Sequence, residues 1–282
     1  MPSSPINRDD GVIEGFGAEW SYFDQSALTD EERRQIFQDY FSLFPWDELP
    51  EGAVGVDVGC GSGRWAAVAA PLAGVLHCVD PSDAIDVAKK NLSAHSNVEF
   101  HRAGVDDLPF ADESLDFAYC LGVLHHVPDP LAGLRAIRQK LKPGAPFLVY
   151  IYYAFENRPW YFRAIWRLSD LVRRVLSRLP FVARLAASQI IAVLFYWPLA
   201  RTASLLDKIG CLPRNWPLAY YRDKSFYIIR ADALDRFGTR LEHRFTRVQI
   251  HHLLKQAGFR DPLFSDTVPY WCAVTRRETD QD

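Results

Sequence analysis

Three glycines at alternate positions, with an aspartate just before them, form the pattern in this sequence with the clearest chemistry. The segment 54–58 reads as a buried strand, and Gly59, Gly61 and Gly63 follow it directly. Because glycine has no Cβ, a ligand can approach the backbone there. A tight turn can also aim N–H groups and a helix N-terminus at that ligand. The spacing is G-x-G-x-G, which differs from the G-x-G-x-x-G of dinucleotide-binding proteins.

Two aspartates accompany this turn. Asp57 lies two positions before the first glycine, and Asp80 lies 23 residues later, directly after a second predicted strand. A carboxylate at the end of that strand can accept hydrogen bonds from both hydroxyls of a ribose. The alternative is that Asp57 only organises the glycine turn and Asp80 only caps the turn that includes Pro81. The glycines and the spacing favour ligand binding for both aspartates.

Two adjacent histidines follow the fourth predicted strand. His125 or His126 could act as a general base toward a hydroxyl or amine acceptor. The alternative is that one packs on the sheet and the other orients a loop. Cys60 has no base beside it in the sequence, so it reads as a small buried residue rather than a nucleophile. Arg64, in the first helical turn, is either solvated or a partner for a ligand carboxylate.

Alternating strands and helices are expected to bring these residues together. The predicted strands are 54–58, 75–79, 98–101, 115–121 and 145–152, and the predicted helices are 64–70, 84–92 and 131–141. This rhythm predicts a parallel, doubly wound sheet whose right-handed crossovers place all strand C-termini along one edge, where ligands bind. An amphipathic helix capped by Thr29 or Asp30 is expected before the first strand. A helix at 247–257 and strands near 262–265 and 270–275 are expected at the end.

Composition limits the class of protein. The 282 residues are 49% hydrophobic and 24% charged, which excludes a disordered chain. A net charge of −3 argues against a basic nucleic-acid binder. Five widely spaced cysteines without a C-x-x-C pair favour a reducing, cytoplasmic setting over a disulfide framework or zinc site. No secretory signal is recognisable, and the sixteen-residue apolar stretch 185–200 is shorter than the about 20 residues of a membrane span, so a soluble protein is expected.

The alternating rhythm breaks at about residue 154. Segment 158–208 is helical in period, rich in aromatic residues and interrupted by Pro159, Pro180 and Pro198, so short helices joined by hinges are predicted. The segment carries nine basic and two acidic residues, a charge of +7 that leaves −10 for the rest of the chain. Three interpretations stay open. It is a lid that guides an anionic or amphipathic acceptor, a solvated cationic face over an ordinary core, or a helix pair resting on anionic lipid.

Residues 54–152 resemble class I S-adenosylmethionine (SAM)-dependent methyltransferases of the small-molecule branch called methyltransferase type 11. The motifs that carry the resemblance are, in order, 56–64, 79–82, 106–117, 121–127 and 141–144. The resemblance implies an α/β fold: a Rossmann-like, doubly wound, mostly parallel sheet of seven strands with the last antiparallel, and a helical lid inserted after the fifth strand. The expected parts are an N-terminal helical flap (1–53), the SAM-binding core (54–153), the lid (154–230) and a completion of the core (231–282).

The resemblance also implies SAM as cofactor, S-adenosylhomocysteine as product, and no metal. Gly104 stands where the family often has Asp or Ser, so Asp106 or the Val105 backbone N–H is assigned to the adenine. Trp20 is expected to fold over the cofactor, or else to pack in the core. The residues assigned to the cofactor are Trp20, Asp57, Gly59, Cys60, Gly61, Gly63, Arg64, Asp80, Pro81, Val105, Asp106 and Leu121.

The expected reaction is methyl transfer to oxygen or nitrogen of a small molecule, in specialised or cell-surface (nucleotide-sugar) metabolism. The residues assigned to the acceptor are Tyr152, Arg163, Arg167, Tyr221 and Arg222. No nucleic-acid partner is expected, because the chain lacks an Asn/Asp-Pro-Pro-aromatic tetrapeptide. The alternatives are a catalytically idle SAM-fold binding module and a lipid or membrane-surface methyltransferase. Weak membrane contact through the lid and the oligomeric state are left open.

Overall fold

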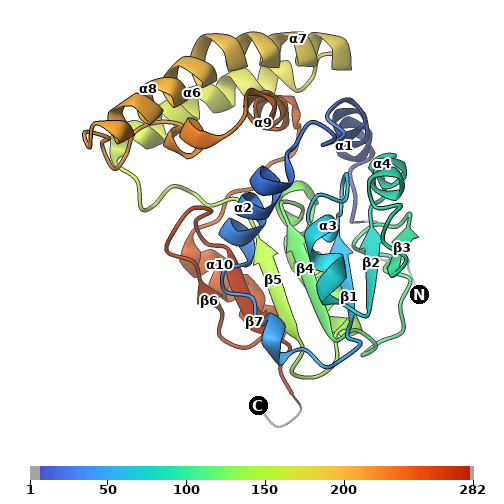
Figure 1. The fold of residues 1–282 in the computed structure, drawn as a ribbon. Helices are drawn as coiled ribbons and strands as arrows, with labels where there is room; N and C mark the ends of the chain where they lie inside the picture. The colour runs from blue at the N-terminus through green and yellow to red at the C-terminus, as the bar shows by residue number, and fades with distance from the viewer. Residues whose placement is uncertain (1–6, 280–282) are drawn as a thin grey trace. The chain divides into compact units, whose positions relative to one another are not determined.

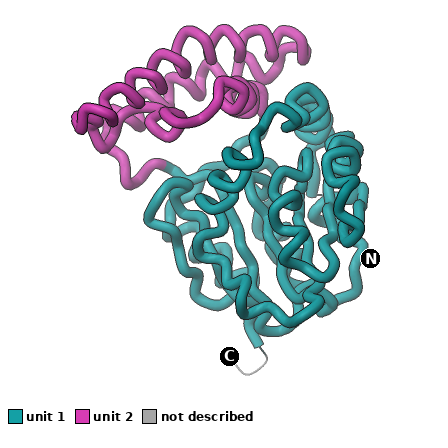
Figure 2. The backbone as a smooth tube through the Cα atoms, viewed as in Figure 1, with its two compact units in different colours: residues 1–154, 241–282 teal, residues 155–240 magenta. Residues whose placement is uncertain are grey.

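The computed structural model describes residues 7–279, which divide into two compact units (Figure 2). Unit 1 comprises the residues up to 154 and from 241 onward, and unit 2 comprises residues 155–240. Unit 2 is therefore the insertion after the fifth strand. It extends to residue 240 rather than the expected 230, because α9 (Phe226–Gly238) is a single helix that packs on the other helices of the insertion.

Unit 1 is built on a seven-stranded sheet in the order β3-β2-β1-β4-β5-β7-β6 (Figure 1). Strands β1 to β5 pair in parallel, and β7 runs antiparallel to both of its neighbours, β5 and β6. This confirms the predicted sheet of seven strands with the last antiparallel. The strands are β1 (Val54–Val58), β2 (Val75–Val79), β3 (Val98–His101), β4 (Phe117–Leu121), β5 (Pro146–Tyr150), β6 (Leu263–Phe264) and β7 (Ala273–Arg276).

Six α-helices accompany this sheet in the described part of unit 1. They are α1 (Asp10–Tyr22), α2 (Asp30–Phe41), α3 (Ala66–Ala69), α4 (Ala84–Asn91), α5 (Pro130–Lys140) and α10 (Arg247–Gln256). Helix α2 begins as predicted, because the Thr29 side chain accepts a hydrogen bond from the N–H of Glu32. Helix α1 was not predicted, since its glycines have low helix propensity. Asp9 caps it, and Gly17 lets it pack within contact distance of Asp83.

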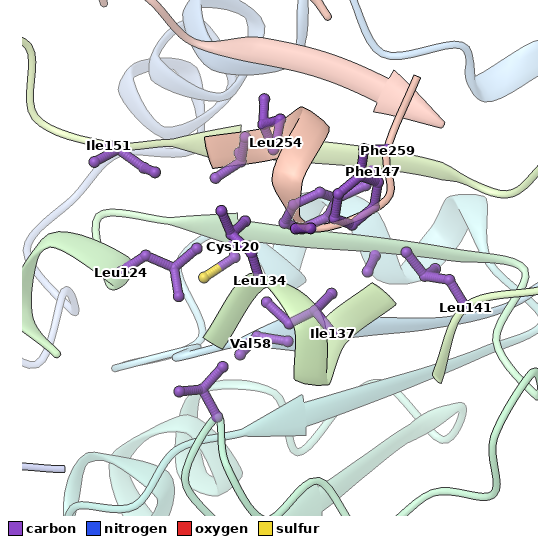
Figure 3. Packing of buried hydrophobic residues seen from close by; sticks show 14 of the residues in the cluster. Val58, Cys120, Leu124, Leu134, Ile137, Leu141, Phe147, Ile151, Leu254 and Phe259 are labelled. Carbon is purple, nitrogen blue, oxygen red and sulfur yellow. The ribbon is translucent and has the colours of Figure 1, made fainter. Parts of the chain in front are cut away.

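Both faces of the sheet are buried. One face packs against α5 and α10 around Cys120, Leu134, Phe147, Leu254 and Phe259. Figure 3 shows the rings of Phe147 and Phe259 close to each other. Those two rings stack with centroids 5.1 Å apart. The continuous apolar runs of the central strands follow from burial on both sides.

The opposite face is covered by an aromatic cluster. Phe41 of α2 packs on the Tyr119 ring of β4, and Trp46 packs on the Phe117 ring with centroids 5.7 Å apart. A Cβ on Gly55 of β1 would lie 2.1 Å from the Phe117 ring, so this strand position accommodates the ring only as glycine. The N-terminal segment thus forms part of the core of unit 1.

Unit 2 is entirely helical in its regular structure. Its helices are α6 (Trp160–Leu176), α7 (Phe181–Ile191), a π-helical turn (Ala192–Tyr196), α8 (Trp197–Lys208), a 3-10 turn (Ala219–Asp223) and α9. Its small core brings Ile229, Ala233 and Phe237 of α9 against Ala192 and Tyr196. The buried Arg173 side chain donates to Asp170 and to the backbone carbonyls of residues 239 and 240.

The predicted hinge at Pro198 is wrong. Residues 181–208 form one continuous helix, in which the N–H of Trp197 donates to the carbonyl of Ala192, five residues back. This π-helical turn changes the hydrogen-bond register just before Pro198, which sits in the first turn of α8, where a proline is tolerated. Pro159 and Pro180, in contrast, precede α6 and α7, as a proline that ends a helix should.

Because this helix is continuous, the expectation that the apolar segment is too short to cross a membrane is also wrong. The 28-residue helix Phe181–Lys208 is long and apolar enough, by length and composition alone, to cross a membrane. Only 17% of its most apolar window is buried, whereas a helix in the core of a soluble protein is mostly buried. One such helix is weak support for a span, but its exposed apolar surface needs a physical explanation.

Candidate active site

The glycine turn, Asp80 and the histidines all follow strands that meet at one edge of the sheet. In the order β3-β2-β1-β4-β5, successive strands are added on opposite sides of β1, so the topology reverses between β1 and β4. In open α/β sheets, ligands bind outside the carboxyl ends of the strands at such a switch point. The structure therefore assembles the predicted motifs where a ligand site is expected on topological grounds.

The turn after β1 requires glycine. Gly59, Gly61 and Gly63 have φ angles of +76°, +53° and +78°, which L-residues with a side chain rarely adopt. A Cβ on Gly59 would lie 2.3 Å from Val123 Cγ2. The N–H groups of Gly59 and Cys60 donate to the carbonyl of Val79 at 2.7 and 3.0 Å, which ties the turn to the end of β2.

Asp80 connects the two turns at this edge. One carboxylate oxygen accepts from the N–H of Gly61 at 3.0 Å, and the other accepts from the N–H and the hydroxyl of Ser82 at 2.9 and 2.6 Å. Burial raises the pKa of Asp80, and the bonds from Ser82 and Gly61 oppose that effect. Asp80 therefore caps its own turn, in which Pro81 lies. Each oxygen still has lone-pair capacity for a ribose hydroxyl.

Asp57 is a fully buried carboxyl at the end of β1. No donor among residues 7–279 is in hydrogen-bonding geometry with either of its oxygens. Burial raises the pKa of Asp57 well above its usual value, and the nearby Tyr119 hydroxyl on β4 partly opposes this. A buried carboxyl without a complete set of donors, next to a turn that exposes backbone, suits a ligand that supplies the missing partners.

Helix α1 lies across this edge of the sheet. The indole nitrogen of Trp20 is 3.1 Å from the position that a Cβ on Gly61 would take, and the Phe16 ring lies 4.9 Å from that of His126. The Arg64 guanidinium sits 5.6 Å from the Trp20 ring and 4.3 Å from the Trp65 ring. Arg64 is thus held between two indoles rather than fully solvated. The position of Trp20 agrees with a flap over the cofactor, a role that stays a prediction.

The loop after β3 holds the residues assigned to adenine. Val105 is buried, and an oxygen of Asp106 lies 2.6 Å from where a Cβ on Gly104 would be. The Asp106 carboxylate thus fills the space that a side chain at position 104 would take. Its other oxygen accepts from the N–H of Asn7 at 2.9 Å, and the Asn7 side chain pairs with the backbone of Asp129. The assignment to adenine stays a prediction.

His125 is buried in an arrangement that suits a hydrogen-bond donor. Its ring stacks on Tyr152 with centroids 3.7 Å apart, and its Nδ1 accepts from the N–H of Tyr152 at 3.3 Å. The proton of the neutral ring must then be on Nε2, for which residues 7–279 offer no acceptor. Burial and the neighbouring His126, Arg244 and His243 lower the pKa of His125 well below its usual value. Both features make His125 a poor proton acceptor.

His126 has the opposite tautomer. Its Nδ1 lies 2.7 Å from the carbonyl oxygen of Leu241, so Nδ1 carries the proton and Nε2 carries the lone pair. This is the form that a general base needs. Leu121, at the end of β4, is buried just before this segment, and Gly122 donates its N–H to the carbonyl of Tyr150.

Sequence reasoning missed the contribution of residues 241–245. Besides the carbonyl of Leu241, this segment supplies Arg244, whose guanidinium lies 4.8 Å from the centroid of the Tyr152 ring and donates to the carbonyl of Tyr153. The N–H of His243 donates to the carbonyl of His125. The segment is short, charged and without helical or strand period, so no sequence signal marked it. It places an ion pair, in which Arg244 Nε lies 2.8 Å from a carboxylate oxygen of Glu242, beside the predicted acceptor residue Tyr152.

The remaining predicted acceptor residues belong to unit 2. Arg163 and Arg167 are exposed on α6. Tyr221 packs against the unit 2 core, and Arg222 pairs with Asp207 and Asp223. The last two residues therefore hold the insertion together, and a role for any of the four toward an acceptor stays a prediction.

One group of side chains in the described residues could hold a metal ion. His77 Nδ1 on β2 lies 3.2 Å from a carboxylate oxygen of Glu99 and 3.1 Å from Nε2 of His101, both on the edge strand β3. Burial lowers the pKa of both histidines. These contacts are also what a neutral histidine pair beside a carboxylate would make. The expectation of methyl transfer without metal stays a prediction.

The fold and the site are similar to those of class I SAM-dependent methyltransferases. Residues 56–149 match the family model described as a methyltransferase domain. A putative methyltransferase from Bacillus halodurans C-125 superimposes with a TM-score of 0.51, covering 88% of this chain and 100% of that one at 13% identity. A likeness at that identity establishes the fold alone. Residues 56–149 are therefore similar to a methyltransferase domain, and residues 155–240 are a helical insertion after β5.

Two curated relatives match the same core. A demethylmenaquinone methyltransferase from Bacillus licheniformis is 30% identical over 100 residues, covering 34% of this chain and 43% of that protein. A ubiquinone biosynthesis O-methyltransferase from Xanthomonas campestris pv. campestris is 36% identical over 96 residues, covering 33% and 40%. The chain thus matches less than half the length of either relative.

Proposed function

We propose that this protein transfers a methyl group from SAM to an oxygen or nitrogen atom of a small-molecule acceptor in the cytoplasm. The observation that carries the proposal is the assembly of Asp57, the glycine turn and Asp80 at the switch point of the sheet. The two relatives, named for demethylmenaquinone methylation and for O-methylation in ubiquinone biosynthesis, support a small-molecule acceptor.

The main role of the site residues would be to bind SAM and hold it in a fixed position. Asp80 would accept from the ribose hydroxyls, and Asp106 or the Val105 N–H would bind the adenine. The glycine turn with Trp20 and Arg64 would surround the methionine end. SAM, when bound, supplies a methyl group on a sulfonium, which is already reactive toward displacement. Holding donor and acceptor in line can supply roughly 7–11 kcal/mol of the barrier, so the absence of a catalytic triad is no obstacle.

Among the two histidines, His126 is the better general base. Its Nε2 lone pair is fixed by the hydrogen bond from Nδ1 to Leu241, whereas the Nδ1 lone pair of His125 is taken by the N–H of Tyr152. An acceptor hydroxyl or amine would give its proton to Nε2 of His126 as the methyl is transferred. A positioned base typically contributes 10²–10⁴-fold to such a step.

The acceptor is best described as anionic or amphipathic. Arg244, beside Tyr152 in unit 1, is ion-paired with the buried side chain of Glu242 at 2.8 Å, so its charge is balanced within the site. The support for this part of the proposal is the exposed arginines and aromatic residues of the insertion in unit 2. Placement in specialised or cell-surface metabolism stays part of this proposal and is not required by the chemistry.

Transfer of an isotopically labelled methyl group tests the proposal directly. The purified protein would be incubated with methyl-labelled SAM and fractionated polar and lipid extracts, with mass spectrometry to find a product that carries the label. We expect one labelled small molecule, and much less of it with the Asp80→Ala variant at a SAM concentration near the wild-type Kd. Tight SAM binding without any labelled product across all fractions would favour a catalytically idle binding module. Labelled RNA would favour a nucleic-acid substrate instead.

A further inference from the structure

Helix α6 of unit 2 exposes an apolar stripe along its full length. Trp160, Leu168, Leu171 and Val175 are 74%, 65%, 60% and 64% exposed. Their spacing of eight, three and four residues places them on one side of a helix with 3.6 residues per turn. Ile165 and Val172, which are 53% and 41% exposed, widen the stripe on one flank. Exposed apolar surface of this extent is unusual for a monomeric soluble protein.

The stripe is not the side by which α6 is anchored in its own unit. That side carries Trp166 and the buried pair Asp170 and Arg173. The Arg236 guanidinium of α9 lies 5.9 Å from the Trp166 ring, and Arg173 donates to carbonyls directly after α9. The apolar stripe therefore faces away from α9.

Arginines border the stripe on its other flank. Arg163, Arg167 and Arg174 of α6 are exposed, as is Arg178 in the turn just after the helix, and their spacing of four, seven and four residues again defines one side of the helix and its first continuing turn. No acidic residue between positions 7 and 279 forms an ion pair with Arg163, Arg167 or Arg178. The only acidic residue of α6, Asp170, is buried and paired. Every exposed charge on α6 is thus positive.

The long helix Phe181–Lys208 adds to this surface. Val182, Ile190, Val193 and Leu194 are all more than half exposed. The buried side of the helix packs on α9, where Ala192 lies in one cluster with Ile229 and Ala233 of α9. Helices α6 and α7 lie beside each other in Figure 1 and both contact α9. Both therefore turn their apolar residues away from the same supporting helix.

We propose that unit 2 binds the surface of an anionic lipid membrane through α6 and the adjoining side of α7 and α8. An amphipathic helix with arginines beside an apolar face lies in the plane of the membrane interface. Its apolar side chains enter the acyl boundary and its cations meet the headgroups. A second copy of the chain explains the charge pattern less well, because α6 offers no exposed acidic partner for its own arginines. The proposal goes beyond methyl transfer and does not depend on it.

Vesicle binding by the full chain, without SAM or acceptor, tests the proposal. Sedimentation would be compared on vesicles of phosphatidylcholine alone and of phosphatidylcholine mixed with phosphatidylglycerol. We expect binding to the anionic vesicles, weaker binding as salt is raised, and little binding to the neutral ones. No binding to the anionic vesicles would overturn the proposal.

Two sets of variants separate charge from apolar contact. Arg163→Gln, Arg167→Gln and Arg178→Gln together should weaken binding on the order of 100-fold, since each arginine near an anionic surface contributes about 1 kcal/mol. The control is Arg34→Gln, Arg135→Gln and Arg214→Gln, which removes the same charge from exposed positions elsewhere. Equal losses in both triple variants would show only a general charge effect and would overturn the proposal.

The apolar contact is tested with Leu168→Asp and Val175→Asp, against Leu72→Asp and Val248→Asp at exposed positions of unit 1. Only the first pair should abolish vesicle binding, while the circular dichroism spectrum and SAM affinity hold in both. A wild-type dimer that the first pair converts to a monomer, with no vesicle binding in either form, would assign the surface to a second copy. Wild-type protein that resists alkaline extraction from membranes would instead indicate a span through Phe181–Lys208.

Discussion

At the scale of single residues, two buried groups have opposite consequences for the same site. Asp57 has no complete set of donors in the described residues, which is costly in a folded chain without ligand. Both carboxylate oxygens of Asp80 accept hydrogen bonds, and these bonds join the glycine turn to the turn after β2. In the ligand-free protein, Asp57 therefore destabilises the fold and Asp80 stabilises it, although both are assigned to the same site. Substitutions at these two positions should act in opposite directions on stability.

Asp57→Asn should stabilise the ligand-free protein at neutral pH. The folded-state pKa of Asp57 is raised, so the carboxyl destabilises the fold once the pH rises above its unfolded-state pKa, and the penalty is complete above the raised folded-state pKa. The penalty disappears as the pH falls to about 3, below the unfolded-state pKa of about 3.9, where the carboxyl is neutral in both states. Thermal melting followed from about pH 3 to about pH 8 should show a Tm a few degrees higher for the variant at the upper end and no difference at the lower end. A variant that melts below wild type at about pH 8 would contradict this interpretation. The same variant should also bind SAM more weakly than wild type.

The two histidines should differ in catalysis. His126→Ala should lower kcat by 10²-fold or more with little change in SAM affinity, because the proposed base is lost. His125→Ala should act mainly on stability, because its buried ring stacks on Tyr152 and accepts from the backbone. Single-turnover rates and melting curves of both variants separate the roles. A rate defect confined to His125→Ala would reverse the assignment.

At the scale of elements, the sequence predicted those parts of the fold whose pattern is local. Strands β1, β2 and β3 have the predicted bounds, because short apolar runs end there at glycine, aspartate or other turn residues. Helix α1 escaped prediction because glycine has low helix propensity, and one of its glycines, Gly17, is explained only by contact with the turn at Asp83, far away in the sequence. Pro198 was misjudged because a π-helical turn is a tertiary accommodation without a local signal.

The candidate site divides in the same way. The glycine turn, Asp80 and the two histidines were identified from spacing alone, since each follows a recognisable strand. The protonation states and tautomers of these residues could not be identified from the sequence. The tautomer of His126 is set by the carbonyl of Leu241, which lies 115 residues later in the chain. Arg244 reaches the site from the same distant segment.

Helix α1 carries a prediction at this scale. Trp20→Ala should weaken SAM binding about tenfold, because the indole packs over Gly61 and Arg64. Tyr22→Ala is the matched control, since this aromatic residue on the same helix is 49% exposed. Calorimetric titration of both variants decides the matter. Equal affinities in Trp20→Ala and wild type would assign α1 to packing alone.

At the scale of the whole molecule, the two units have separate cores. The core of unit 2 depends on Ile229, Ala233 and Phe237 of α9, which lie beyond the segment 158–208 that the charge pattern first marked as the insertion. The chain leaves unit 1 and returns to it at neighbouring positions, because the N–H of Ala154 donates to the carbonyl of Phe245. The insertion is therefore removable as a unit at residues 155–240.

Two deletions test this division. Replacing residues 155–240 by a short glycine-serine linker should leave a soluble core that binds SAM with near wild-type affinity. Deleting only 158–208 should cause aggregation, because α9 would lose the helices that cover its apolar side. Size-exclusion chromatography and SAM titration of both proteins provide the measurement. A well-behaved 158–208 deletion beside an insoluble 155–240 deletion would contradict the two-unit division.

The central claim, that the edge of the sheet at β1 and β2 binds SAM, is tested most directly by calorimetric titration of SAM into wild type, Asp80→Ala and Asp83→Ala. Asp83 is the control because its exposed carboxylate pairs with Arg102 and takes no part in the glycine turn. We predict a wild-type Kd well below about 1 mM, an unchanged Kd for Asp83→Ala, and a Kd raised about 10- to 150-fold for Asp80→Ala. No wild-type binding at about 1 mM, or an unchanged Kd for Asp80→Ala, would contradict the claim.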